Sequence, residues 1–290
     1  MRWLLLLLAL AGCAQRPKPP TPAAHYLIGS PYEAGGAWFY PREDFRYDAT
    51  GLAERLPDRT GLTADGERFD PAAMAGAHPT LQLPAIARVT DLENGRQVVL
   101  RLNDRGPGRP GRILGLTRRA AELLDVPAGA AVRVRVQVED GPSQALRDRL
   151  QGGPSGITAA PRGTVTEEAL APPPGVGQSA RGRVAIATPA AANATEAGPE
   201  VPDRLPEVVA QVAPQPGQLW IEAGRFGQAA YANQVRAKLY GMPVDVERTA
   251  GARPPSFRVM AGPFPTVAAA DAALDQARRA GVTDAQIVVE

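Results

Sequence analysis

The sequence predicts a multidomain protein with two small folded parts, a mainly β barrel over residues 25–139 and an α+β sandwich over 216–290. Three observations support this prediction. Short strand-like runs with a single helical segment fill the first part, which is typical of a small barrel. A β-α-β pattern occurs twice in the last part. Residues 140–215 are rich in Pro, Ala, Gly, Thr and Ser, and such a composition predicts a disordered linker because it buries too little surface to offset the entropy of ordering.

The first residues have the features of an export signal. Arg2 supplies a positive charge, an apolar run follows from Trp3 to Leu10, and small residues lead to Cys13, the only cysteine in the chain. The run is too short to span a bilayer as a permanent helix. Residues 1–12 are therefore predicted to be a signal peptide, and the Pro-rich residues 13–24 a flexible spacer.

The end of this segment, Leu10-Ala11-Gly12-Cys13, resembles the lipobox of bacterial lipoproteins. The resemblance implies that Cys13 is lipidated and becomes the first residue of the mature chain, anchored in a membrane. Because Ala14 follows, it also implies sorting to the outer membrane. The alternative is an ordinary secretory signal cut near Ala11 or Ala14.

The clearest element of the predicted barrel is a β-hairpin. Runs 80–92 and 97–103 flank Glu93-Asn94-Gly95-Arg96, and Asn-Gly favours a type I′ turn because both central residues need positive φ. In the second run the residues alternate between two faces: Val98, Leu100 and Leu102 share one face, and Val99, Arg101 and Asn103 share the other.

Three further elements complete the predicted barrel. A short helix starts after the N-cap Thr117, continues through Leu124 and stops at Val126-Pro127. A half-buried strand follows, because valines alternate with polar residues from Val132 to Val138. The aromatic cluster at Trp38, Phe39 and Tyr40 belongs either to the core or to a platform for stacking sugars, and the core is the favoured interpretation.

The last part of the chain repeats a pattern at a fixed offset. The strand-like segment 220–226 matches 258–264, and each is followed by a helical segment and then a glycine, Gly241 or Gly281, at the expected end of the helix. Further strands are predicted at 244–246 and 287–289. The repeat predicts a split-βαβ sandwich with one open sheet face.

Composition excludes several classes of function. The chain has 32 basic and 30 acidic residues, and such a balance is not that of a dedicated nucleic-acid binder. One cysteine and two histidines leave little material for a metal centre. No cofactor and no metal are therefore expected.

Three blocks of the first part together resemble the rare lipoprotein A family. These blocks are Leu62-Thr63-Ala64-Asp65-Gly66-Glu67-Arg68-Phe69, Ala75-Gly76-Ala77-His78-Pro79-Thr80-Leu81 and Arg101-Leu102-Asn103-Asp104-Arg105-Gly106-Pro107. The repeat at 216–290 resembles a SPOR domain. The resemblance implies a six-stranded double-psi β-barrel that acts on peptidoglycan as a lytic transglycosylase. It also implies a SPOR domain that binds glycan strands lacking stem peptides at the division septum, where division-site proteins are further possible partners.

The resemblance also suggests roles for individual residues. A lytic transglycosylase cuts without water, so a single carboxyl can serve first as general acid and then as general base. Asp104 is assigned that role, Glu67 is the second carboxylate, and His78 orients groups in the groove. The predicted substrate-binding residues are Thr63, Arg101, Asn103, Arg105, Trp220 and Arg258.

Each of these residues also has a simpler interpretation. Asp104 and Arg105 could form a local ion pair that closes a turn, Glu67 could be idle in a solvated turn, and His78 could be structural. The sequence also departs from the family pattern. Ala53-Glu54-Arg55-Leu56-Pro57 stands where an aromatic segment is usual, Asp58-Arg59-Thr60-Gly61 replaces Phe-His-Gly-Arg, and Gly115 replaces an Asp. A non-catalytic, expansin-like peptidoglycan-binding lipoprotein is therefore the alternative function.

Overall fold

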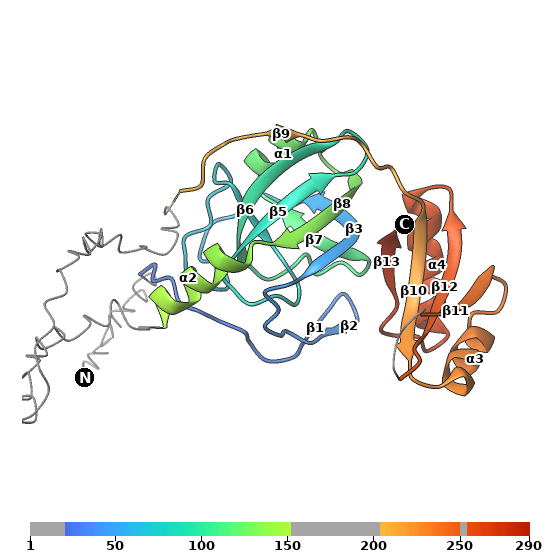
Figure 1. The fold of residues 1–290 in the computed structure, drawn as a ribbon. Coiled ribbons are helices and arrows are strands. Elements are labelled where there is room, and N and C mark those ends of the chain that lie inside the picture. Colours follow the sequence, from blue (N-terminus) through green and yellow to red (C-terminus); the bar gives the residue numbers. More distant parts are fainter. Residues whose placement is uncertain (1–20, 152–203, 250–253) are drawn as a thin grey trace, which may run out of the picture.

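The computed structural model describes residues 21–151, 204–249 and 254–290, which form a barrel domain and a smaller C-terminal domain (Figure 1). The predicted signal peptide, Cys13 and residues 152–203 of the predicted linker lie outside the described residues. No helix within the described part of the chain is long and apolar enough to cross a membrane.

The barrel is built from six strands. They are β3 (Asp48–Arg55), β4 (Ala75–Ala77), β5 (Ala85–Asp91), β6 (Arg96–Asp104), β7 (Arg112–Leu116) and β8 (Ala131–Val138). Their order is β4-β7-β3-β8-β5-β6, and parallel pairing of β4 with β6 closes the circle. Pairing of β3 with β7 is also parallel, whereas the other neighbours are antiparallel. This closed mixed sheet confirms the predicted six-stranded barrel.

The predicted hairpin is β5–β6, with Ala85 opposite Leu102 and Thr90 opposite Gln97. The predicted type I′ turn is wrong: Gly95 has φ 76°, but Asp125 is the only non-glycine residue with positive φ in the described ranges, so Asn94 does not have it. The alternation in β6 is also confirmed. Val98, Leu100 and Leu102 are buried in the barrel core, and this places Arg101 and Asn103 on the opposite face, where the candidate site lies.

Helix α1 (Arg118–Leu124) begins where the sequence predicts. The Thr117 hydroxyl accepts a hydrogen bond from the Ala120 N–H, and Asp125 ends the helix in the left-handed conformation with φ 62°. Ala120, Ala121 and Leu124 turn toward the core.

An aromatic hairpin precedes the barrel strands. It consists of β1 (Tyr32–Ala34) and β2 (Ala37–Phe39). Phe39 stacks on Tyr32 with ring centroids 5.3 Å apart. Trp38 and Tyr40 are 56% and 58% exposed, so the favoured interpretation that they are core residues is wrong.

The segment expected to be a disordered linker, 140–215, has secondary structure at both ends. Helix α2 (Asp140–Leu150) begins it, and strand β9 (Ala210–Gln211) pairs with β6 near its end. Helix α2 was not predicted from the composition because only two of its residues, Ser143 and Leu146, are buried, and they give no clear apolar pattern. Leu146 packs on Ile86, and the Ser143 hydroxyl accepts from the Ile86 N–H.

The C-terminal domain is a four-stranded antiparallel sheet with two helices. Its elements are β10 (Leu219–Phe226), α3 (Ala229–Lys238), β11 (Val244–Arg248), β12 (Phe257–Phe264), α4 (Val267–Arg279) and β13 (Gln286–Val289). The strand order is β11-β12-β10-β13. Gly241 and Gly281 follow the two helices with φ 85° and 81°. These elements confirm the predicted repeat.

The two domains pack against each other along β3 and β13, which lie side by side in Figure 1. The Thr50 hydroxyl donates to the Val289 carbonyl at 2.6 Å and accepts from the Val289 N–H at 3.1 Å. Arg112, almost fully buried, makes a bidentate ion pair with Asp271 of α4 at 2.7 and 2.8 Å. The C-terminal domain is therefore fixed on the barrel.

Candidate active site

A tight turn over residues 63–67 presents Glu67. The Asp65 side chain holds this turn, because its Oδ1 accepts from the Thr63 hydroxyl at 2.7 Å and from the Glu67 N–H at 3.2 Å. Gly66 has φ 85°, and a Cβ there would lie 2.4 Å from the Ala23 carbonyl oxygen, so only glycine fits. The Asp65 N–H donates to the Asn103 carbonyl at 3.2 Å, which fastens the turn to β6.

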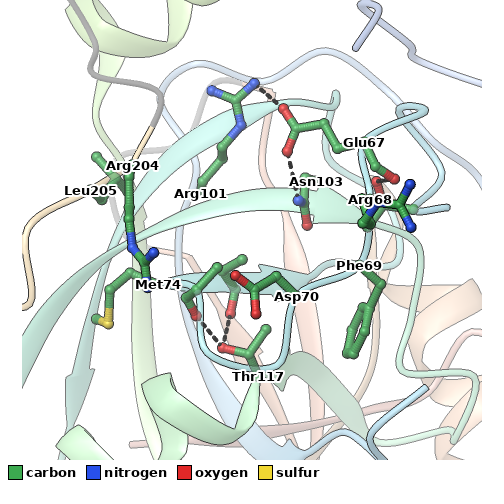
Figure 2. A pocket seen from close by; sticks show the side chains of 13 residues that line it. Glu67, Arg68, Phe69, Asp70, Met74, Arg101, Asn103, Thr117, Arg204 and Leu205 are labelled. Carbon is green, nitrogen blue, oxygen red and sulfur yellow. Dashed lines mark hydrogen bonds and ion pairs between the residues drawn. The ribbon is translucent and has the colours of Figure 1, made fainter. Parts of the chain in front are cut away.

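Glu67 lies at the centre of a polar cluster on the outer face of β6 (Figure 2). It forms an ion pair with Arg101 and accepts from the Asn103 amide at 2.8 Å. All three residues line a cavity of about 220 Å³, together with Thr63, Phe69, Asp70, Met74 and Thr117. Nε and Nη1 of Arg101 are buried and have no hydrogen-bond partner among the described residues. The cavity is therefore lined by a carboxylate, a guanidinium and an amide, which suit a ligand rich in hydroxyl oxygens.

Asp104 lies at the end of β6, beside the same turn. Its Oδ1 accepts from the Ala64 and Arg105 N–H groups, both at 2.9 Å. Its Oδ2 forms an ion pair with Arg59, whose guanidinium also lies 4.5 Å from the centre of the Phe69 ring. Every polar neighbour of this carboxylate therefore donates to it. Arg59 would have to move before Asp104 Oδ2 could contact a substrate.

The imidazole of His78 faces a different part of the molecule. The His78 N–H donates to the Asp104 carbonyl at 3.0 Å, so the two backbones are adjacent. The ring, however, lies edge-on to Tyr47 at 4.9 Å and lines a separate cavity of about 260 Å³. Nδ1 accepts from the Thr80 and Leu81 N–H groups, so the proton is on Nε2. Burial, reinforced by the charges of Arg105 and Arg42, lowers the pKa of His78 to about 3, which keeps the ring neutral.

The structure thus brings Glu67, Arg101 and Asn103 together and places the Asp104 backbone next to His78. It does not bring the three predicted catalytic side chains into one cavity, because His78 and Glu67 line separate ones.

The other predicted binding residues are dispersed. The Arg105 guanidinium donates to the carbonyls of Ile28, His78 and Leu81, so it does not form the local ion pair with Asp104 that was the alternative. Trp220 and Arg258 lie on adjacent strands of the C-terminal sheet, where Arg258 pairs with Glu222 at 2.6 Å.

Two site residues were missed by sequence reasoning. Arg59 belongs to the segment Asp58–Gly61 that departs from the family pattern, but nothing in a loop sequence indicates that its side chain would reach Asp104. Asp65 stands in the first of the three blocks that carry the family resemblance, and an acidic residue directly before Gly66-Glu67 was the available signal. Within the described residues, no group of three or more acidic, histidine or cysteine side chains is arranged to hold a metal ion.

The Leu56 side chain accounts for the glycine at position 115, where the family pattern has an Asp. A Cβ at Gly115 would lie 2.5 Å from Cδ2 of Leu56. The space next to β7 is thus filled by Leu56, which directly follows β3 and stands in the segment where aromatic residues are usual.

Comparison with known proteins gives two family matches. Residues 33–136 match the family described as "Lytic transglycolase", and residues 215–288 match the SPOR domain. The chain is 31% identical to the endolytic peptidoglycan transglycosylase RlpA of Pseudomonas aeruginosa PAO1 over 251 residues, which are 84% of this chain and 72% of the relative. It is 35% identical to RlpA of Yersinia pestis over 149 residues and 41% identical to RlpA of Escherichia coli K12 over 102 residues.

Those two alignments span 41% and 28% of the relatives' own lengths and 43% and 34% of this chain. The fold and the two matches define a two-domain protein in which a lytic-transglycolase barrel carries a SPOR domain. The chain belongs to the RlpA family, as the long match to the Pseudomonas relative shows.

Proposed function

We propose that this protein is an endolytic peptidoglycan lytic transglycosylase that acts on glycan strands lacking stem peptides. The observation that carries the proposal is the Glu67–Arg101–Asn103 cluster, which lines an open cavity in a chain of the RlpA family, with Asp104 bound to the turn that presents Glu67. Arg101, which lines this cavity, has two buried N–H groups without a hydrogen-bond partner in the described residues, and guanidinium groups are suited to sugar hydroxyl or carboxylate oxygens.

In the proposed reaction, the carboxyl of Asp104 gives a proton to the leaving glycosidic oxygen as the bond from C1 to that oxygen breaks. The sugar's own C6 hydroxyl then attacks C1 and returns its proton to Asp104, which leaves a 1,6-anhydro end and consumes no water. Glu67, held by Arg101 and Asn103, steadies the positive charge that develops at C1. Proton transfer of this kind contributes on the order of 10²–10⁴-fold.

The test is mass spectrometry of the products released from amidase-treated sacculi. The wild-type chain should release anhydro-ended fragments, and Asp104→Asn and Glu67→Gln should each lower the rate by about 10²-fold or more. Asp58→Asn is the matched control, since Asp58 is an exposed carboxylate that pairs with Arg118 at 3.0 Å. Equal rates for Asp104→Asn and Asp58→Asn would contradict the assignment.

One observation favours the second candidate, a non-catalytic expansin-like protein that binds peptidoglycan. Both carboxylates are paired with arginine, Glu67 with Arg101 and Asp104 with Arg59, so an arginine occupies the position beside each carboxylate that a substrate would need. Wild-type protein that sediments with the sacculi but releases no anhydro ends would support this candidate.

The location of the protein is part of the same proposal. Cys13 carries the lipid that holds the chain on the periplasmic side of the outer membrane, and the SPOR match supports recruitment to the division septum. Each acyl methylene contributes about 0.8 kcal/mol to membrane binding. Cys13→Ala should therefore move the protein from the membrane fraction to the soluble fraction, and no change in fractionation would contradict lipidation.

A further inference from the structure

A groove runs between the two domains, separate from the cavity that holds Glu67. It consists of two cavities of about 260 and 780 Å³. They adjoin because they share the lining residues Arg42, Tyr47, Thr80, Ile113 and Gln286. We call these two cavities the interdomain groove.

We propose that the interdomain groove is a second binding site for an acidic glycan strand, formed jointly by the barrel and the open sheet face of the SPOR domain. The identity of the ligand rests on the proposed function, since a strand without stem peptides exposes one lactyl carboxylate on each muramic acid residue. The new part of the proposal is that the barrel contributes one wall of the site, so that both domains bind the same strand.

Exposed aromatic side chains line the smaller cavity. Trp38 and Tyr40 are more than half exposed, and they are held on a braced hairpin. Phe39, between them, stacks on Tyr32. A Cβ at Gly35 would lie 2.4 Å from the Gly108 carbonyl oxygen, so the hairpin lies close against the barrel. Rigid aromatic surfaces that remain in water mark ligand sites, and the C–H faces of sugar rings stack on them.

The larger cavity carries an excess of positive charge. Its charged lining residues are Arg42, Arg46, Arg135, Arg225 and Arg258 against Asp44, Asp48 and Glu222. The Arg46 side chain has no hydrogen bond or ion pair with any residue in the described ranges. Arginine pairs with carboxylates through two parallel hydrogen bonds, so the charge of this cavity complements that of the proposed strand.

The interdomain groove depends on the docking of the two domains. The buried Arg112–Asp271 pair joins β7 to α4, and the Arg278 guanidinium of α4 donates to the Gly36 carbonyl at the tip of the aromatic hairpin. The same helix thus fixes the SPOR domain and the hairpin. Both walls of the groove are positioned before the ligand arrives, which lowers the entropic cost of binding.

Binding to amidase-treated sacculi tests the barrel wall. The full chain carries Asp104→Asn throughout, so that the strands stay intact while co-sedimentation is measured. Trp38→Ala/Tyr40→Ala and Arg42→Ala/Arg46→Ala should each weaken binding by about tenfold, as expected for aromatic and arginine anchors. For neutral chitin oligosaccharides, which have no carboxylate, the aromatic pair should matter and the arginine pair should not.

The matched control is Tyr231→Ala/Arg236→Ala on α3, where both side chains are exposed and outside the interdomain groove. The control should bind as tightly as the parent chain. If both barrel-side variants also bind as tightly as the parent, the barrel takes no part and the proposal is overturned.

Breaking the domain contact provides a second, independent test. Asp271→Arg places like charges together at Arg112 and should weaken binding to the sacculi as much as the barrel-side variants do. Asp275→Arg, one turn further along α4 and exposed, is its control. Binding unaffected by Asp271→Arg would show that the two domains act separately. If binding depends on the interdomain groove but the chain with Asp104 intact releases no anhydro products, the proposed cleavage is refuted and the groove proposal stands.

Discussion

Asp65, the buried carboxyl that holds the turn before Glu67, should make the stability of the barrel depend on pH. It is fully buried, and its Oδ2 has no hydrogen-bond partner among the described residues. Burial raises the pKa of Asp65 from 3.8 to about 6, opposed by the hydrogen bond from the Thr63 hydroxyl and assisted by the charge of Glu67.

The sign of the effect follows from proton binding. Between pH 3.8 and about 6, the folded chain keeps a proton on Asp65 that the unfolded chain has lost. The free energy of unfolding therefore falls as the pH rises through this window, and it stays lower above pH 6. A difference of about two pKa units corresponds to about 3 kcal/mol at full extent.

Replacing Asp65 with Asn tests this reasoning, because Asn has the shape of the protonated acid and keeps an oxygen for Thr63. We expect Asp65→Asn to match the wild type near pH 4 and to be more stable by about 3 kcal/mol near pH 7.5. The measurement is hydrogen exchange of the β5 and β6 amides, since a protein with two domains need not unfold in one step.

The wild type has to be compared with Asp65→Asn because His78 changes the pH dependence of the stability in the opposite direction. The pKa of His78 is lowered from 6.5 to about 3 in the folded chain. Below pH 6.5 the unfolded chain therefore binds a proton on His78 that the folded chain does not bind. The free energy of unfolding falls as the pH is lowered. The two effects overlap in the wild type, and subtracting the variant isolates Asp65. If the difference between wild type and Asp65→Asn is the same at pH 4 and pH 7.5, the reasoning is refuted.

Three further substitutions test the local packing. Ser143→Ala should cost about 1–3 kcal/mol, because it leaves the Ile86 N–H without its 2.9 Å partner, and unchanged hydrogen exchange in β5 would contradict this. Gly115→Ala should cost about 1–3 kcal/mol through the clash with Leu56, and adding Leu56→Ala should recover part of that loss in urea unfolding, whereas strictly additive losses would argue against the clash. Thr117→Ala should cost about 1–2 kcal/mol through loss of the N-cap, with a lower thermal midpoint as the readout.

The parts of the fold that the sequence predicted are those set by local patterns. The β5–β6 hairpin, the alternation in β6 and the Thr117 cap each depend on a few neighbouring residues. The repeat at 216–290 was visible because the same strand and helix pattern occurs twice. Helix α2 was not predicted, because its two buried residues, Ser143 and Leu146, give almost no hydrophobic periodicity.

The candidate site was predicted only in part, because side-chain direction depends on the tertiary structure. Alternation placed Arg101 and Asn103 on one face of a strand, and the structure adds Glu67 to them. No local pattern showed that the His78 ring would turn toward Tyr47, or that Arg59 would reach Asp104 from another loop. The contact between the two domains could not be predicted from the sequence either, since Arg112 and Asp271 lie far apart in the chain.

Leu52 and Leu92 have a consequence for how such proteins can change. Both belong to the barrel, yet both are buried in the same hydrophobic cluster as Leu219, Ile221 and Ile287 of the SPOR domain. A SPOR domain taken from another protein would meet these two leucines with side chains not shaped to receive them. Exchange of whole modules would thus leave a poorly filled junction, and the two halves of this chain are expected to evolve as one unit.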